Sequence, residues 1–168
     1  MNYRMILFIL GWVLKIQAAC FVLPMGVGVF YGEKEWKVYA VAAVITFISG
    51  VLLTIKKPRK TVFFAKDGYV IVALSWAVLS VTGALPFVIT GEIPHFIDAV
   101  FEAASGFTTT GASIVPNVEA LSHGSLFWRS FTHWIGGMGV LVFIMAVVPS
   151  STDRSIHIMK AEVPGPIV

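Results

Sequence analysis

The sequence predicts an all-α transmembrane protein, with two N-terminal spanning helices followed by a helix, a re-entrant loop and a further helix. The first observation is composition: 57% of the 168 residues are hydrophobic and 12% are charged, with a mean hydropathy of +0.86. One soluble domain could not bury this much apolar surface. The second is a set of four segments that have the roughly 20 apolar residues needed to cross a hydrocarbon core of about 30 Å. The third is a short apolar helix that precedes a threonine- and glycine-containing stretch, between the last two segments.

The four apolar segments cover residues 5–32, 38–55, 68–91 and 130–152. Pro24 and Pro86 lie inside the first and the third segment, where each removes one backbone donor. Because neighbouring helices in a membrane protein can satisfy the freed carbonyl groups, we expect kinks at these prolines and not helix ends. The first two segments form an N-terminal membrane hairpin within residues 1–60.

The first segment has a competing interpretation as a cleaved signal peptide, because residues 17–20 (QAAC) are similar to a lipoprotein cleavage box. Lys15 inside the apolar region, Gln17 in place of an aliphatic residue and an apolar run that continues to Phe30 favour a retained helix. Lys15 has two open interpretations: a functional intramembrane charge, or a side chain that snorkels or pairs with Gln17. The single cysteine, Cys20, provides no disulfide framework and is expected to be an apolar filler.

The basic residues predict the orientation. With the N-terminus inside, eight of them lie on the cytoplasmic side: Arg4, Lys56, Lys57, Arg59, Lys60, Lys66, Arg154 and Lys160. Three lie outside: Lys34, Lys37 and Arg129. This excess places both termini in the cytoplasm, with Trp36 and Trp128 at the outer interface and Tyr69 at the inner one. The topology and the lipid bilayer also account for the net charge of +3, so nucleic acid is not expected as a partner.

The residues between the last two spanning segments predict a half-length helix. After Pro94, apolar residues recur at helical spacing from Phe96 to Ala104, which indicates a helix over about residues 96–106. Pro94 and Asp98 lie near its N-terminal end, where each is favoured. A helix of about 11 residues is about 16 Å long, roughly half the hydrocarbon thickness. It can therefore enter the membrane but cannot cross it.

The stretch after this helix consists of Thr108, Thr109, Thr110, Gly111 and Ala112. Irregular backbone at the bilayer midplane is tolerated only where protein buries it or where it lines a water-filled cavity. Closely spaced carbonyl oxygens can replace the hydration shell of a monovalent cation, and Gly111 allows the dihedral angles that aim successive carbonyls the same way. The partially negative end of the half-helix adds an attraction for cations. We predict a cation-selectivity filter at residues 108–112. The alternative, without a role in transport, is a helix C-cap and turn.

Three motifs resemble one known family. Residues 101–113 (FEAASGFTTTGAS), 134–139 (WIGGMG) and 161–166 (AEVPGP) are similar to the first pore loop, the following inner helix and the connection to the next repeat in Trk/Ktr potassium transporters. The two preceding spans resemble the Trk branch. This resemblance implies that residues 61–152 are the first helix–pore loop–helix repeat. It also implies that Thr109, Thr110 and Gly111 bind potassium through their backbone, flanked by Thr108 and Ala112.

The resemblance also implies the setting in which the chain works. It implies a bacterial-type inner (plasma) membrane, potassium as the transported ion and no covalent cofactor. It implies a cytosolic nucleotide-binding regulatory subunit as a partner, so that a nucleotide acts only through that partner. Full-length members of the family are expected to be dimeric.

The chain departs from the family in length. Family members place four repeats around one pore, whereas this sequence contains one repeat and ends with residues 153–168, a cytoplasmic tail leading toward a missing second repeat. Since one loop supplies only a quarter of a filter, we interpret the chain as the N-terminal portion of a potassium uptake transporter. A self-assembling homotetrameric cation channel is the alternative, and a non-conducting structural or regulatory membrane subunit is a third.

Glycines in the last span also have two interpretations. Gly136, Gly137 and Gly139 could bind phosphate in a soluble protein, but no strand precedes them. Within a membrane span they are expected to allow a bend or close helix packing.

An enzyme is the alternative to the transporter interpretation. Ser113, His133 and Asp98 could form a nucleophile, a base and an orienting carboxylate. Because no Gly-x-Ser-x-Gly turn surrounds Ser113, we do not expect an enzyme. His133 could line an outer vestibule or bond to the loop backbone, and we favour a structural role; His95 and His123 are expected to be solvated.

Overall fold

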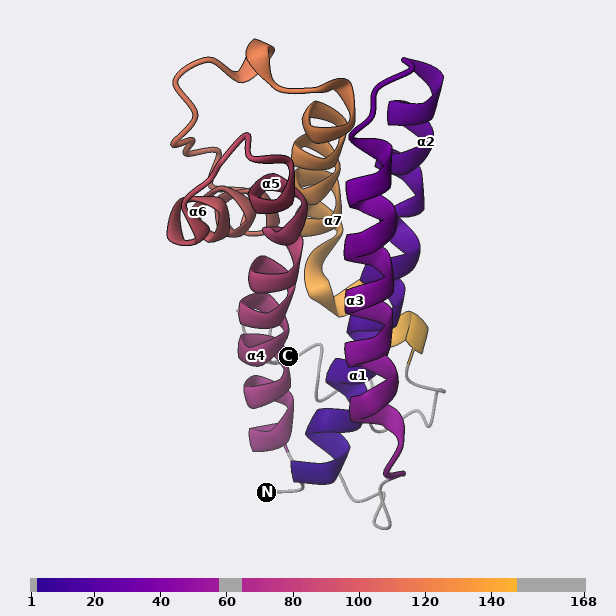
Figure 1. The fold of residues 1–168 in the computed structure, drawn as a ribbon. Helices are drawn as coiled ribbons and strands as arrows, with labels where there is room; N and C mark the ends of the chain where they lie inside the picture. Colours follow the sequence, from indigo (N-terminus) through magenta and orange to yellow (C-terminus); the bar gives the residue numbers. More distant parts are fainter. Residues whose placement is uncertain (1–2, 58–64, 148–168) are drawn as a thin grey trace.

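The computed structural model describes residues 3–57 and 65–147. All regular structure in these residues is helical: α1 (Tyr3–Cys20), α2 (Val22–Phe30), α3 (Trp36–Thr54), α4 (Ala65–Gly83), α5 (Leu85–Thr90), α6 (Phe96–Phe107), η1 (Val118–Ala120) and α7 (His123–Val147). In Figure 1, α1, α3 and α4 run along one another, whereas α6 lies across them beside α5. The predicted all-α class is confirmed.

Three helical stretches in the described residues are long and apolar enough to cross a membrane: Tyr3–Phe30, Trp36–Thr54 and Asp67–Thr90. They coincide with the first three predicted spans. The fourth predicted span begins inside α7, and its last residues, 148–152, lie outside the described residues. The tail at 153–168 also lies outside them, as does the loop at 58–64, which carries Arg59 and Lys60.

Both prolines lie within a span, each shortly after a one-residue interruption at which one helix ends and the next begins. Pro24 is in the first turn of α2, directly after the break between α1 and α2 at Phe21, whose amide still donates to the Gln17 carbonyl at 3.1 Å. Pro86 follows the break between α4 and α5 at Ala84, whose amide donates to the Ser80 carbonyl at 3.1 Å. Because hydrogen bonds of helical type continue across each break, the chain keeps its course through the span.

The α1–α3 hairpin is held by a close approach of two glycines. A Cβ added to Gly11 would lie 2.7 Å from the Gly50 carbonyl oxygen, and one added to Gly50 would lie 2.7 Å from the Gly11 carbonyl oxygen. Small residues let helix backbones approach in this way, which increases packing between helices in a membrane. The crossing point of α1 and α3 is therefore fixed by this glycine pair.

Gln17 connects α1 to α4. Its side chain is buried; its amide donates to the Leu79 carbonyl at 3.1 Å, and Thr82 donates to its oxygen at 2.5 Å. Among the open interpretations of Lys15, a pair with Gln17 is therefore not the one that forms. The Lys15 ammonium lies 4.7 Å from the ring centroid of Trp12, a cation–π contact that sequence spacing alone did not indicate.

Trp128 was predicted at the outer membrane interface, but it is fully buried. Its ring lies 4.4 Å from that of Phe21 and 6.3 Å from that of Phe107, and its indole N–H donates to the Gly83 carbonyl at 2.9 Å. The residue faces the junction of several helices, a position that its distance from the end of a span does not reveal. With its N–H satisfied, this aromatic side chain can form part of the core.

At the outer end predicted from the basic residues, Glu33 holds the start of α7. Its carboxylate accepts hydrogen bonds from the His123 amide at 2.9 Å, the Gly124 amide at 3.3 Å and the His123 ring at 2.7 Å. The ring of Tyr31 stacks on His123 with centroids 3.9 Å apart. His123, predicted to be solvated, is thus half-exposed but paired. A carboxylate at a helix N-terminus is favoured by the free amides and by the helix dipole.

The Glu33 contacts predict acid sensitivity. Burial raises the pKa of Glu33, but hydrogen bonds from His123 and Gly124 outweigh this effect and hold the pKa below its ordinary value of 4.5. A carboxyl with a lowered folded-state pKa stabilises the fold above its unfolded-state pKa, and that contribution is lost as the pH falls through the folded-state pKa. Thermal unfolding should therefore show a drop in stability on acidification that is smaller in Glu33→Gln.

The matched control is Glu35→Gln, two residues away, whose side chain makes no cap hydrogen bond to α3. This variant should keep the acid dependence of the wild type. An identical acid dependence in Glu33→Gln and the wild type would contradict the assignment.

Candidate functional site

The site is built on α6, which presents the threonine stretch at its C-terminal end. The helix has 12 residues, from Phe96 to Phe107, so it extends about 18 Å and cannot cross a hydrocarbon core of about 30 Å. It begins after Pro94 and buries one face, formed by Ala99, Glu102, Ala103, Ser105, Gly106 and Phe107. Its bounds agree with the predicted helix at 96–106 to within one residue. It packs against both α4 and α7.

The chain leaves α6 through a turn in which two residues adopt left-handed backbone angles. Gly111 has φ 75°, as its proposed role requires, and Thr109 has φ 56°, which was not predicted. A left-handed threonine is strained by about 1–3 kcal/mol and is retained only where the surroundings enforce it. Here the Thr109 amide donates to the Gly106 carbonyl and the Thr110 amide to the Ser105 carbonyl, both at 3.0 Å.

The threonine side chains bond to the helix end and to each other. The Thr108 hydroxyl donates to the Ala104 carbonyl at 2.7 Å and lies 2.8 Å from the Thr110 hydroxyl. The carbonyl oxygens of Thr109, Thr110 and Gly111 accept no hydrogen bond from the part of the chain that the structure describes. All three residues are exposed. Within the described residues, these three oxygens thus have no hydrogen-bond partner in the protein.

Ala112 differs from its neighbours in this respect. Its carbonyl oxygen accepts a hydrogen bond of 2.5 Å from the Ser105 hydroxyl. Ser105 lies on the buried face of α6, so this bond ties the far side of the loop back to the helix. The Ala112 carbonyl is thus engaged by the protein.

The sequence analysis missed Glu102, which anchors the loop. This carboxylate is 2% exposed and accepts hydrogen bonds from the Ser113 hydroxyl at 3.0 Å and the Ile114 amide at 3.0 Å. Arg129 of α7 donates to it through Nε at 2.5 Å, forming an ion pair between the two helices. Opposite charges within two apolar segments were the signal that could have identified this pair.

A close contact between α6 and α7 fixes the helix end. A Cβ added to Gly136 would lie 2.1 Å from the Phe107 carbonyl oxygen, and one added to Gly106 would lie 2.1 Å from the Thr132 hydroxyl. Real Cβ atoms do not approach this closely, so a larger residue at Gly136 would displace the α6 backbone and one at Gly106 would displace the Thr132 side chain. The backbone that leads into Thr108 therefore rests directly on α7.

The other two glycines of the WIGGMG motif have different surroundings. A Cβ on Gly137 would meet no atom within 4 Å. Gly139 has φ 75° and ψ 145°, non-helical angles that interrupt α7.

Two of the three residues of the enzyme alternative are engaged elsewhere. The Ser113 hydroxyl donates to Glu102, and the His133 ring lies 2.9 Å from the Arg129 carbonyl oxygen of its own helix. His133 thus has a contact within α7 and not with the loop backbone. Within the described residues, no group of three or more His, Cys, Asp or Glu side chains could hold a metal ion. The geometry is that of an exposed threonine- and glycine-containing loop supported by a buried ion pair.

Helices long enough to span a membrane, a half-length helix and exposed loop carbonyls together define a membrane protein of the ion-transport class. Residues 36–168 match the family model described as TrkH, cation transport protein. The chain belongs to this family. Because the family consists of cation transport proteins, the enzyme alternative is rejected.

Individual relatives agree with this assignment. The chain is 34% identical over 99% of its length to the Trk system potassium uptake protein TrkH of Halomonas elongata. It is also 34% identical over 98% of its length to the Trk system potassium uptake protein TrkG of Escherichia coli. The crystal structure of the potassium transporter TrkH from Vibrio parahaemolyticus is similar with a TM-score of 0.79 and 30% identity, over 96% of this chain and 36% of that one. The chain thus spans about a third of the length of its relatives: 35% of the first and 34% of the second.

Proposed function

We propose that the chain is the N-terminal part of a potassium uptake transporter and supplies one quarter of its selectivity filter. The observation that carries this proposal is the row of carbonyl oxygens at Thr109, Thr110 and Gly111, which accept no hydrogen bond within the described residues. Carbonyl rings of this kind replace the hydration shell of a potassium ion. Thr108 and Ala112 flank the row, and the partially negative C-terminus of α6 adds a favourable field.

The exposure of the loop supports a shared pore. Residues 108–114 are all exposed in this chain, although a dehydrated ion needs oxygens on every side. Three further loops would complete the ring, either from the remaining repeats of a longer transporter or from other copies of this chain. We propose the first arrangement, in a plasma membrane with both termini in the cytoplasm and residues 61–152 as the first pore repeat.

The proposed path runs inward from the outer side. A potassium ion exchanges water for the carbonyl oxygens of Thr109, Thr110 and Gly111 and then moves down its electrochemical gradient. Glu102 and Arg129 do not touch the ion in this scheme. They hold the ascending arm of the loop, through Ser113 and Ile114, at a fixed distance from α7.

Gly111→Asp tests the filter. In cells that express the complete transporter proposed above, rubidium uptake should fall to background, because the aspartate strains a left-handed position and places a fixed charge beside the ion path. Gly32→Asp is the matched control: Gly32 has φ 69° and Gly111 φ 75°, and neither has an atom within 4 Å of an added Cβ. Uptake should persist in the control. Equal uptake in Gly111→Asp and the wild type would contradict the filter assignment.

The same assay separates the two assemblies when potassium-uptake-deficient cells express the 168 residues alone. Uptake that Gly111→Asp abolishes would mean that four copies form a complete pore. No uptake, with the chain confirmed in the membrane, would support one quarter of a filter that needs the remaining repeats.

A further inference from the structure

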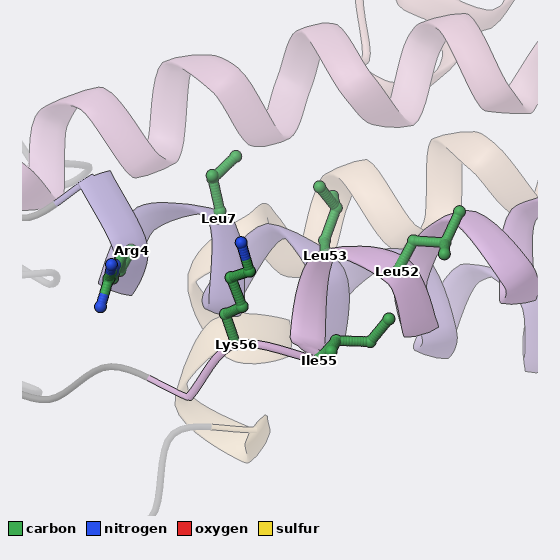
Figure 2. Close-up of a pocket in the computed structure, with 6 residues that line it drawn as sticks. All are labelled: Arg4, Leu7, Leu52, Leu53, Ile55 and Lys56. Atoms are coloured by element: carbon green, nitrogen blue, oxygen red, sulfur yellow. The ribbon is translucent and has the colours of Figure 1, made fainter.

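The basic ends of α1 and α3 enclose a groove outside the proposed ion path. The groove has a volume of about 290 Å³ and is lined by Arg4, Leu7, Leu52, Leu53, Ile55 and Lys56. Figure 2 shows the Lys56 side chain extending from the end of α3 beside Leu7 and Leu53, with Arg4 on the preceding turn of α1. Two cations and four aliphatic side chains thus share one opening.

The helix crossing explains why a groove forms here. At Gly11 and Gly50 the two backbones are in contact. Packed helices cross at an angle, so they diverge on either side of the contact point. Leu7 lies one turn from Gly11, toward the end of α1 that carries Arg4. The wedge between the diverging helices is the groove.

The groove lies at the depth of lipid headgroups. The α3 helix has 19 residues, about 28 Å, so its two ends reach the two boundaries of a hydrocarbon core of about 30 Å. Lys56 is the second residue after the end of α3, and Arg4 is in the first turn of α1. Both cations therefore lie where phosphate groups lie, while Leu52 extends toward the acyl chains.

The charges and the apolar surface are both available to a ligand. Arg4 and Lys56 are exposed, and neither forms an ion pair with any residue in the described part of the chain. Leu7, Leu52 and Ile55 are 45%, 62% and 64% exposed. A phosphodiester beside an acyl chain is complementary to this combination of charge and apolar surface.

We propose that this groove binds one anionic phospholipid, with its phosphate between Arg4 and Lys56 and the start of an acyl chain against Leu7, Leu52 and Ile55. The anionic headgroup neutralises the charges of Arg4 and Lys56, which both line this groove at the depth of the lipid headgroups. The lipid also fills the wedge between α1 and α3, and so supports the packing of the N-terminal hairpin. This proposal does not depend on the filter.

Native mass spectrometry of the protein in its natural full length tests this proposal. The protein in detergent is titrated with phosphatidylglycerol or with phosphatidylcholine of the same acyl chains. The wild type should retain one phosphatidylglycerol in preference to phosphatidylcholine. Arg4→Gln/Lys56→Gln should bind that phosphatidylglycerol about 25-fold more weakly, since each basic residue at a membrane surface contributes about fivefold.

Two further variants separate the parts of the proposal. Lys34→Gln/Lys37→Gln removes the same charge at the other end of the hairpin and should bind phosphatidylglycerol like the wild type. Leu7→Trp keeps both cations but fills the groove, so it should also weaken phosphatidylglycerol binding severalfold.

Several outcomes would overturn the proposal. One is equal retention of the two lipids by the wild type, and another is unchanged phosphatidylglycerol binding in Arg4→Gln/Lys56→Gln. Unchanged phosphatidylglycerol binding in Leu7→Trp would mean that the lipid is held by general attraction to a basic surface and not by a site in the groove. Failure of the wild type to retain any lipid would mean that another part of the protein or a partner covers the groove.

Discussion

In the complete transporter, Gly136→Ala is expected to lower rubidium uptake at least tenfold, while Gly137→Ala leaves it intact. The alanine methyl group at position 136 would lie 2.1 Å from the Phe107 carbonyl oxygen and 2.8 Å from the Phe107 carbonyl carbon. Backbone cannot rotate away as a side chain can, so the C-terminal end of α6 must shift from α7. Overpacking of this kind typically costs about 1–3 kcal/mol, and here the displaced backbone leads directly into Thr108.

Gly137→Ala is a stringent control, because it makes the same chemical change one residue further along the same helix. No atom lies within 4 Å of a Cβ at this position. Both variants should be quantified in the membrane, and uptake should be expressed per molecule. At least a tenfold loss, about the effect of a 1.4 kcal/mol change, is expected for Gly136→Ala alone. Equal uptake by the two variants would show that the α6–α7 contact does not position the loop.

Glu102→Gln is expected to lower both stability and uptake. The substitution keeps the size of the side chain but leaves the Arg129 guanidinium without its carboxylate partner. Removing one member of a buried ion pair costs about 3–5 kcal/mol. Since the Arg129 side chain is 20% exposed and that of Glu102 1%, water can partly solvate the arginine, and we expect a loss near the lower end, about 3 kcal/mol. Thermal unfolding in detergent measures it.

A double-mutant cycle isolates the pair. Glu102→Gln/Arg129→Gln should recover part of the lost stability, because neither charge then remains unpaired. Asp98→Asn, one turn earlier on α6, is the matched control and should unfold close to the wild-type temperature. Additive losses in the double variant would show that the two side chains act independently. Uptake should follow the order of stability, because Glu102 also holds Ser113 and Ile114.

The sequence was sufficient for features that arise from local pattern and composition. The period of apolar residues from Phe96 to Ala104 predicted α6 to within one residue, and three of the four predicted spans match candidate spans in the described residues. Local sequence controls these features because helix length and periodicity depend on neighbours along the chain. The positive φ of Gly111 was also expected from residue type alone.

Features that depend on distant contacts were missed or misplaced. Trp128 was expected at a membrane interface, and only the packing of Phe21 and Phe107 around it explains its burial. The left-handed angle of Thr109 follows from the bonds that the loop makes to the end of α6, not from a preference of threonine. Neither feature has a signature within a short window of sequence.

The sequence by itself thus determined the class of protein and the order of its helices, because hydropathy and residue type act locally, and the proposed filter rests on the same local pattern. Only the tertiary structure decided how that filter is held. Glu102 and Arg129 are 27 positions apart, and Gly136 meets Phe107 from another helix. Such contacts depend on how α6 and α7 pack, and a carboxylate or a glycine acquires its role only from the atoms that packing brings next to it.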